Sequence, residues 1–458
     1  MTLYRIRILL FITFISLVTS VACYAQSSTI SPYSRYGIGD LQNQYGAQSF
    51  SMGQTGIALH NDSLAPPYFI NLKNPASYFY NRITTIEAGI LNQNTQLNTE
   101  GLTHKNSNSY FGYFAIAFPV GKHFGVCMGL RPMSSVGYSI NTASTIDSAG
   151  HPLTGSGGSV DSVDNQYVAS GGINQLHLGL AYSPFKNLSV GVNASYLFGN
   201  IITTDNVIYP LNMAAYNSQR TENVNVHGFT FDYGAMYTLG KTRDSVWQVV
   251  LGATASLGGS VNAGYNLLSI SYVAATPQTN IDTIQDSNSG GKLKLPIAFG
   301  GGISVIKRGI YGDMWTFTFD YSVQNWSQYT YFGQPQSSLT NSSQMGLGVQ
   351  FVPNKNGFNS HKQSYFSRAF YRFGIDYEQT YLDINNTPLK NYCLSLGIGL
   401  PIGPPYVPGL FNQIGTLNLG IQVGQLGTTS DNLLREDYLK FMIAFTFNSL
   451  WFQKRLYQ

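Results

Sequence analysis

Apolar and polar residues alternate along most of this chain, and the clearest run is 315–325. One face of that run is apolar and the other is polar: Trp315, Phe317, Phe319, Tyr321 and Val323 against Thr316, Thr318, Asp320, Ser322 and Gln324. A period of two indicates a β-strand, because a helix repeats every ~3.6 residues. An aromatic and aliphatic face opposite a polar face suits a strand with lipid on one side and a lumen on the other.

Similar alternating segments recur along the chain, and counting them gives about fourteen. They lie near 83–92, 110–118, 124–140, 168–182, 188–202, 226–239, 247–260, 292–306, 315–329, 343–352, 370–384, 390–400, 415–425 and 438–447. Lipid offers backbone groups no hydrogen bonds, so such strands must close into a ring. The pattern predicts an all-β fold, a transmembrane antiparallel β-barrel of about 14 strands with an N-terminal plug.

The connections between these segments fall into two length classes. Those after the second, fourth, sixth and eighth segments are short, and those after the third, fifth and seventh, near 141–167, 203–225 and 261–291, are long and polar. The later turns at 353–369 and 401–414 are longer and fit the rule less well. Short turns on the periplasmic side and long loops outside are typical of outer-membrane barrels.

Residues 1–25 have the features of a signal peptide. Arg5 and Arg7 precede a largely apolar stretch, and Cys23-Tyr24-Ala25 fits a small-x-small cleavage site. Ser20-Val21-Ala22-Cys23 as a lipoprotein signal is the alternative. Either signal means that the chain is exported. Together with the strand pattern, export predicts that the protein lies in the outer membrane of a Gram-negative bacterium.

Composition supports a membrane barrel and excludes several other functions. Charged residues make up only 10% of the chain, where soluble domains carry about 25%. There is no basic run, so we expect no nucleic-acid partner. Cys127 and Cys393 remain after cleavage and are expected to be free thiols. No catalytic or metal-ligand motif is visible, so we expect no enzyme activity, no cofactor and no metal.

Residues 26–82 do not alternate like the rest. They contain Met52-Gly53 and Asn74-Pro75-Ala76, and their prolines prevent long regular elements. This segment could hang in the periplasm or fold into the lumen as a plug or hatch. We favour the plug, because a barrel of this size encloses a cavity unless something fills it. Residues 83–447 would then form the barrel, and 448–458 a periplasmic tail.

These motifs, in their order along the chain, resemble the FadL/TodX family of outer-membrane transporters, in a Bacteroidetes-like form. Met52-Gly53 and Asn74-Pro75-Ala76 resemble the family's plug, and 131–138 resembles its third strand. Leu295-Pro296, Gly300 to Gly302, and Asp320 with Trp326-Ser327 resemble its middle strands. Two features depart from the family: Lys73 replaces the usual aromatic before Asn-Pro-Ala, and a tail follows Phe447.

The resemblance implies an outer-membrane channel that takes up hydrophobic small molecules, such as long-chain fatty acids, and releases them sideways through the barrel wall. The plug motifs would then take part in gating. Pro132 cannot donate a ladder hydrogen bond, so we expect a kink or bulge there with a lateral exit beside it. The alternative is that Pro132 only marks the end of its strand above the membrane.

Two arginines on lumen-facing positions, Arg131 and Arg372, could contact a ligand carboxylate. Alternatively they could pair with lumen acids, for which Asp320, Asp376 and Glu378 are the candidates.

A second function is a FadL-like barrel that acts in protein secretion or cell-surface attachment, as in the type IX secretion shuttle, and binds protein partners instead of transporting a solute. The expected partners are outer-membrane lipid, a hydrophobic ligand and, during biogenesis, the barrel-assembly machinery. We expect a monomer. A large internal apolar cavity would favour transport, whereas a polar outer rim and a filled lumen would favour the interaction role.

Overall fold

The computed structural model describes residues 29–43, 45–61, 68–99, 101–146, 161–185, 187–210, 215–240, 246–273, 279–309, 312–353, 364–402, 414–449 and 451. The expected signal peptide and most of the expected tail lie outside these ranges. Among the described residues, no helix is long and apolar enough to cross a membrane.

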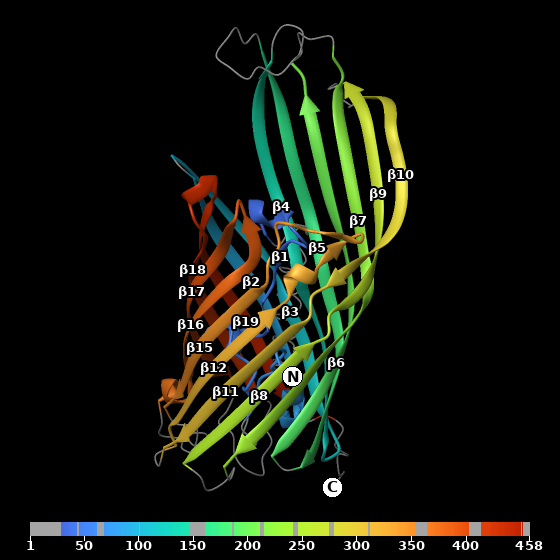
Figure 1. Ribbon diagram of the computed structural model, residues 1–458. Coiled ribbons are helices and arrows are strands. Elements are labelled where there is room, and N and C mark those ends of the chain that lie inside the picture. The colour runs from blue at the N-terminus through green and yellow to red at the C-terminus, as the bar shows by residue number, and fades with distance from the viewer. Residues whose placement is uncertain are drawn as a thin grey trace, which may run out of the picture.

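The barrel is antiparallel and has fourteen strands, as the alternation predicted (Figure 1). Twelve spanning strands are single elements, and two are each built from a pair of elements. The single strands are β2 (Thr84–Thr99), β3 (Leu102–Val120), β4 (Phe124–Ile146), β5 (Asp161–Phe185), β6 (Leu188–Ile208), β7 (Asn217–Leu239), β12 (Met314–Gln324), β15 (Ser342–Val352), β16 (Phe370–Ile384), β17 (Thr387–Ile402), β18 (Ile414–Gly427) and β19 (Arg435–Ser449).

The ring closes where the last strand meets the first. β19 pairs with β2 from Arg435 opposite Asn98 to Ser449 opposite Thr84. Every barrel strand therefore has a neighbour on both sides for part of its length, which satisfies the backbone inside lipid.

The two composite strands are β8 (Trp247–Ser256) with β9 (Gly259–Val273), and β10 (Thr279–Leu295) with β11 (Ala298–Arg308). The breaks lie side by side, because a Cβ on Gly258 would meet the carbonyl oxygens of Leu295 and Pro296 at 2.5 and 2.6 Å. Gly258 has a φ of 64° and Pro296 has no N–H to give to a ladder, so both breaks follow from residue type.

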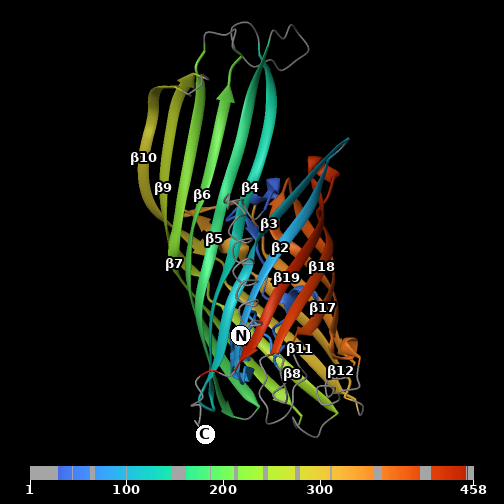
Figure 2. The same ribbon diagram turned by 180° about the vertical axis from the view of Figure 1, so that it is seen from behind.

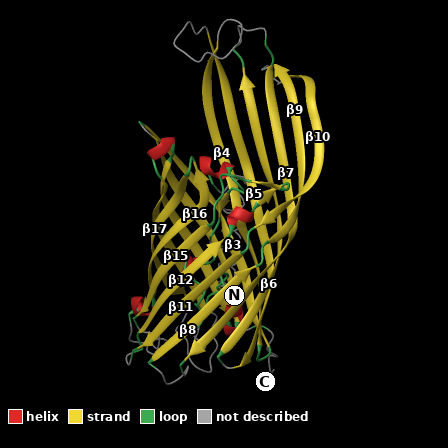
Figure 3. Cartoon of the chain, viewed as in Figure 1, coloured by secondary structure: helices red, strands yellow, loops and turns green. Residues whose placement is uncertain are grey.

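The remaining elements are short. Figure 3 shows how little helix there is beside the strands. These short elements are the 3-10 helices η1 (Pro32–Arg35), η2 (Pro75–Tyr80), η3 (Trp326–Gln328), η5 (Tyr365–Arg368) and η6 (Ser430–Asn432), the helix α2 (Ala47–Phe50), and the short strands β1 (Asp40–Leu41), β13 (Thr330–Tyr331) and β14 (Gln334–Pro335).

Side chains divide between lipid and lumen as the alternation requires. On β12, Phe317, Phe319 and Tyr321 are about 40% exposed, whereas Thr318 and Asp320 between them are 4% and 2% exposed. The large exposed apolar side chains form the outer surface, and the polar face lies against the N-terminal segment inside.

One side of the barrel rises far beyond the other as a tall sheet, seen from both sides in Figures 1 and 2. We call it the extracellular wall: the upper parts of β4, β5, β6, β7, β9 and β10, paired in that order. Short turns such as Gly121–His123 lie at the opposite, periplasmic end, where β19 also ends (Figure 1).

The extracellular wall corrects our expectation of long loops. Residues 261–273 and 279–291 are not loop but belong to β9 and β10, which pair from Gly259–Leu295 to Val273–Thr279. Much of 141–167 and 203–225 is likewise strand. Polar residues such as Arg220, Glu222, Asn223 and Asn266 interrupt these strands, and their apolar side chains, such as Val224 and Val261, are buried against Trp326 and Tyr329, so no continuous lipid-facing period marks them.

Candidate functional site

The N-terminal segment fills the lumen, with nearly all of its described residues buried from Ala47 to Tyr80. Its last turn, η2, explains the Asn-Pro-Ala motif. The Asn74 side chain caps η2 by accepting from the Ala76 N–H at 3.0 Å, and Pro75 occupies the first turn, where its missing N–H costs nothing. We call residues 45–83 the plug.

Glycines on the lumen face of the barrel wall make room for the plug backbone. A Cβ on Gly348 would meet the Met52 carbonyl oxygen at 2.6 Å, and one on Gly374 would collide with the Gly53 N–H. Gly53 itself has a φ of 62° and donates its N–H to Ser395 Oγ at 2.9 Å. Met52-Gly53 therefore lies in close backbone contact with the barrel wall, which glycine permits on both sides.

The second plug motif uses the same device on the opposite wall. A Cβ on Gly191 would lie 2.6 Å from the Ala76 nitrogen, and one on Gly234 would lie 2.8 Å from Pro75 Cδ. The Asn74 amide donates to the Ile57 carbonyl at 2.7 Å and lies near two wall carbonyls. Asn74-Pro75-Ala76 thus joins two parts of the plug to the wall.

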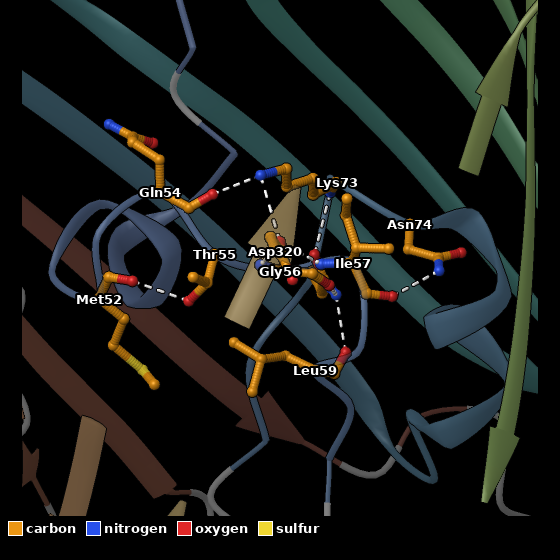
Figure 4. Close-up of polar contacts among 10 residues, drawn as sticks. Met52, Gln54, Thr55, Gly56, Ile57, Leu59, Lys73, Asn74 and Asp320 are labelled. Carbon is orange, nitrogen blue, oxygen red and sulfur yellow. Dashed lines mark hydrogen bonds and ion pairs between the residues drawn. The ribbon is translucent and has the colours of Figure 1, made fainter. Parts of the chain in front are cut away.

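Asp320 of β12 links the barrel wall to the plug through an ion pair and two hydrogen bonds (Figure 4). One of its carboxylate oxygens accepts from the N–H groups of Gly56 at 2.7 Å and Ile57 at 2.9 Å, and lies 3.3 Å from Lys73 Nζ. Lys73 also donates to the Gln54 carbonyl at 2.5 Å. The Lys73 and Asp320 side chains are 9% and 3% exposed, so the pair is withdrawn from water.

Sequence reasoning noticed both members of this pair but did not connect them. Lys73 stood out as the departure from the plug pattern, and Asp320 as an acid on a lumen face. A buried cation on the plug and a buried anion on the wall could have been matched by charge alone.

The barrel wall has a seam between β3 and β4. These two strands pair only from Phe114–Leu130 to Val120–Phe124. Just above, the β4–β5 register shifts between Pro132 and Ser134, so the bulge expected near Pro132 is present. Whether a solute leaves there stays a prediction.

The N-terminal segment covers the β4 side of the seam from within. β1 pairs antiparallel with Ser134 and Ser135, and the Gln42 N–H donates to the Met133 carbonyl at 2.9 Å. The segment is also held on the far side, where the Tyr381 hydroxyl donates to the Gly39 carbonyl at 2.5 Å. No sequence pattern marked β1, which is only two residues long.

The two arginines lie in different places. Arg131 donates to the Gln42 carbonyl at 3.1 Å and stacks over Tyr45 at 4.6 Å, next to the seam. Arg372 is buried and donates to Gln350 Oε1 at 2.9 Å and to Asn418 Oδ1 at 2.8 Å. Asp320, one candidate partner for them, instead pairs with Lys73.

Three cavities lie in the lumen among the described residues. One of about 190 Å³ lies beside Arg131 and Lys73, and two others have volumes of about 90 and 60 Å³. A concavity of about 1190 Å³ lies on the outer face, against Phe319, Leu347 and Ile375, whose side chains point to lipid. The lumen is thus filled, mainly by the plug.

Comparison with known proteins finds similar folds at low identity. The toluene transporter TodX of Pseudomonas putida is 15% identical, with a TM-score of 0.54, over 90% of this chain and 100% of that one. The toluene transporter TbuX of Ralstonia pickettii is 13% identical, with a TM-score of 0.53, over 89% and 99%. A FadL homologue of Pseudomonas aeruginosa is 12% identical, with a TM-score of 0.52, over 88% and 97%.

These likenesses show a FadL-type barrel of the outer membrane of Gram-negative bacteria. No curated protein matches the sequence. A family model described as BamG matches residues 6–458, nearly the whole chain.

Proposed function

The chain belongs to the BamG family, and we propose that it is a closed, plugged outer-membrane barrel that binds protein partners instead of conducting a solute. The name of the family hints at the barrel-assembly machinery, and we take components of that machinery as the partners.

The filled lumen is the observation that carries this proposal. Sites for small ligands usually have volumes of about 300–1,000 Å³ and are mostly apolar. The lumen cavity beside Arg131 has about 190 Å³, and its lining mixes polar side chains such as Lys73, Arg131 and Gln175 with apolar ones such as Leu72, Met133 and Trp326. A long apolar ligand would have to displace the plug and leave these polar groups without partners.

The extracellular wall also supports an interaction role. Its strands carry polar side chains on both faces, such as Asn223, Asn225 and Asn266 on one face and Arg220 and Glu222 on the other. A chain that only formed a pore would need no sheet standing this far above the membrane. The polar positions of this sheet offer a surface on which a second protein can dock.

Uptake of hydrophobic small molecules is the second candidate, and the seam beside Pro132 favours it. An apolar solute released there would enter lipid directly. Arg131 lies beside this seam and could meet a ligand carboxylate, whereas Arg372 lies apart from it and is already bonded to two amides. In this function the plug motifs would move to open the path.

One comparison separates the two functions. Purified protein in liposomes would be tested for uptake of a fluorescent long-chain fatty acid and for bound lipid by extraction, and cells depleted of the protein for their level of other outer-membrane barrels. We expect no uptake above empty liposomes, no specific bound ligand, and reduced barrel assembly. Bound fatty acid, with uptake lost on depletion and barrel levels unchanged, would establish the channel instead.

A further inference from the structure

The upper half of β4 is an open edge of the extracellular wall. β4 pairs with β5 as far as Ile146–Asp161, but on its other side its pairing with β3 ends at Leu130–Phe114. The N-terminal segment then occupies this side up to Gly137. From Ser139 to Ile146, no described residue pairs with this edge.

The backbone groups along this stretch point outward in a regular series. Gly137 donates its N–H to Ser34 Oγ at 3.0 Å, and its carbonyl accepts from the Ser31 N–H at 2.9 Å, so its backbone faces the seam. In an antiparallel sheet alternate residues face the same side. Ser139, Asn141 and Ala143 therefore present their N–H and C=O groups to the same edge.

The opposite edge of the extracellular wall, on β10, is protected against pairing with another strand, and the β4 edge is not. β10 has register shifts between Asn280 and Asp282 and between Thr283 and Gln285, and it carries Asp282 and Asp286. Bulges and charges are how natural sheets block unwanted pairing. Residues 139–146 have no charged residue, no proline and no register shift.

We propose that this edge, Ser139 to Ile146 of β4, receives an extended segment of a partner polypeptide as an added antiparallel strand. The inference rests on the proposed partner-binding function and names the site and the mode of binding. Recognition would use the main chain, so the partner segment needs an extended conformation without proline at the paired positions.

Two observations favour a partner segment over a second copy of this chain. β1 already adds to the same edge antiparallel, immediately below, so the new strand would continue an existing pairing. Two copies in one membrane have the same orientation, so their β4 strands would meet parallel and could not repeat the β1 arrangement.

Hydrogen–deuterium exchange tests the proposal on the full chain. Exchange would be compared between the protein in isolated outer membranes and the purified protein in lipid nanodiscs. We expect amides of 139–145 to exchange about tenfold or more slowly in the native membranes, because an added strand protects them. Amides of 283–292 on the β10 edge should exchange equally in both.

Asn141→Pro removes one outward N–H without removing a bond to β5, and Asn141→Thr is the matched control that keeps the N–H. The proline variant should lose the slowing at the remaining amides, and the threonine variant should keep it. Unchanged heat-modifiable mobility would show that both variants form barrels, and the wild-type comparison stands without either variant.

The outcomes separate the strand-addition site from the partner-binding function. No slowing at 139–145, while barrel-assembly components still co-purify, overturns the edge proposal and leaves the proposed function intact. Slowing in nanodiscs that grows with protein concentration indicates a second copy and also overturns it. Loss of both the slowing and the co-purification removes both inferences.

Discussion

Asp320 holds the plug through one carboxylate oxygen, so its removal is the sharpest test of how the lumen stays filled. In Asp320→Ala, Lys73 would keep the Gln54 carbonyl and the Tyr45 ring, and the N–H groups of Gly56 and Ile57 would lose their acceptor. The charge of Lys73 would remain buried without a counter-ion.

The expected cost follows from that geometry. Removing one member of a buried ion pair costs about 3–5 kcal/mol, and the lost N–H bonds are part of that figure because they share the same oxygen. The cost falls on plug docking and not on barrel unfolding, because the barrel ladder uses the backbone of Asp320 and not its carboxylate. At about 1.4 kcal/mol per factor of ten, exchange of plug amides should accelerate by roughly two to three and a half orders of magnitude.

Hydrogen exchange followed by mass spectrometry measures this directly, with peptides from 47–61 for the plug and from β16 and β18 for the barrel. Thr318→Val is the matched control, because Thr318 lies on the same face of β12 and its hydroxyl has no hydrogen-bond partner. Lys73→Met combined with Asp320→Asn should be milder than Asp320→Ala, since it leaves no unpaired charge. Plug exchange in Asp320→Ala within about threefold of wild type would refute the reasoning.

Three further predictions concern the plug and the segment before it. Gly374→Ala should weaken plug docking by about 1–3 kcal/mol, because the added Cβ would collide with Gly53. Limited proteolysis of the plug should then be faster. Gly301→Ala is the control, because a Cβ there meets nothing within 4 Å, and it should leave proteolysis unchanged. Asn74→Ala removes the cap of η2 and should cost about 0.5–2 kcal/mol, measured as faster exchange in 75–80 and contradicted by unchanged exchange. Burial raises the pKa of Asp40, with Lys440 only partly opposing it, so the docked segment binds a proton more tightly than the free one. Docking of β1 on β4 should therefore weaken as pH rises above the ordinary pKa of an aspartate and through the raised value. Asp40→Asn should abolish the pH dependence of the protection factor of the Gln42 amide, which compares its exchange rate with the intrinsic rate at the same pH, and a persisting dependence would exclude Asp40 as its source.

The barrel could be predicted because contact with lipid requires apolar residues at every second position of each strand. A strand such as 315–325 must present aromatic and aliphatic side chains to lipid at every second position, and that constraint is local. The number of strands and the lumen-facing positions of Asp320, Arg131 and Arg372 follow from the same alternation. Plug motifs were visible for a related reason, since a cap such as Asn74-Pro75 is defined by neighbouring residues.

The tertiary structure decided what these positions meet. The Lys73–Asp320 link, the glycines under Met52-Gly53, and β1 on the edge of β4 join residues far apart in the chain, so no local pattern encodes them. The extracellular wall stayed hidden as well, because its apolar residues, such as Val224 and Val261, pack against Trp326 and Tyr329 from distant parts of the chain and not against lipid. Alternation determined the barrel because each lipid-facing residue meets the same lipid environment whatever its neighbours in the fold. The filled lumen depends instead on which residues meet across it, and only the closed fold brings them together.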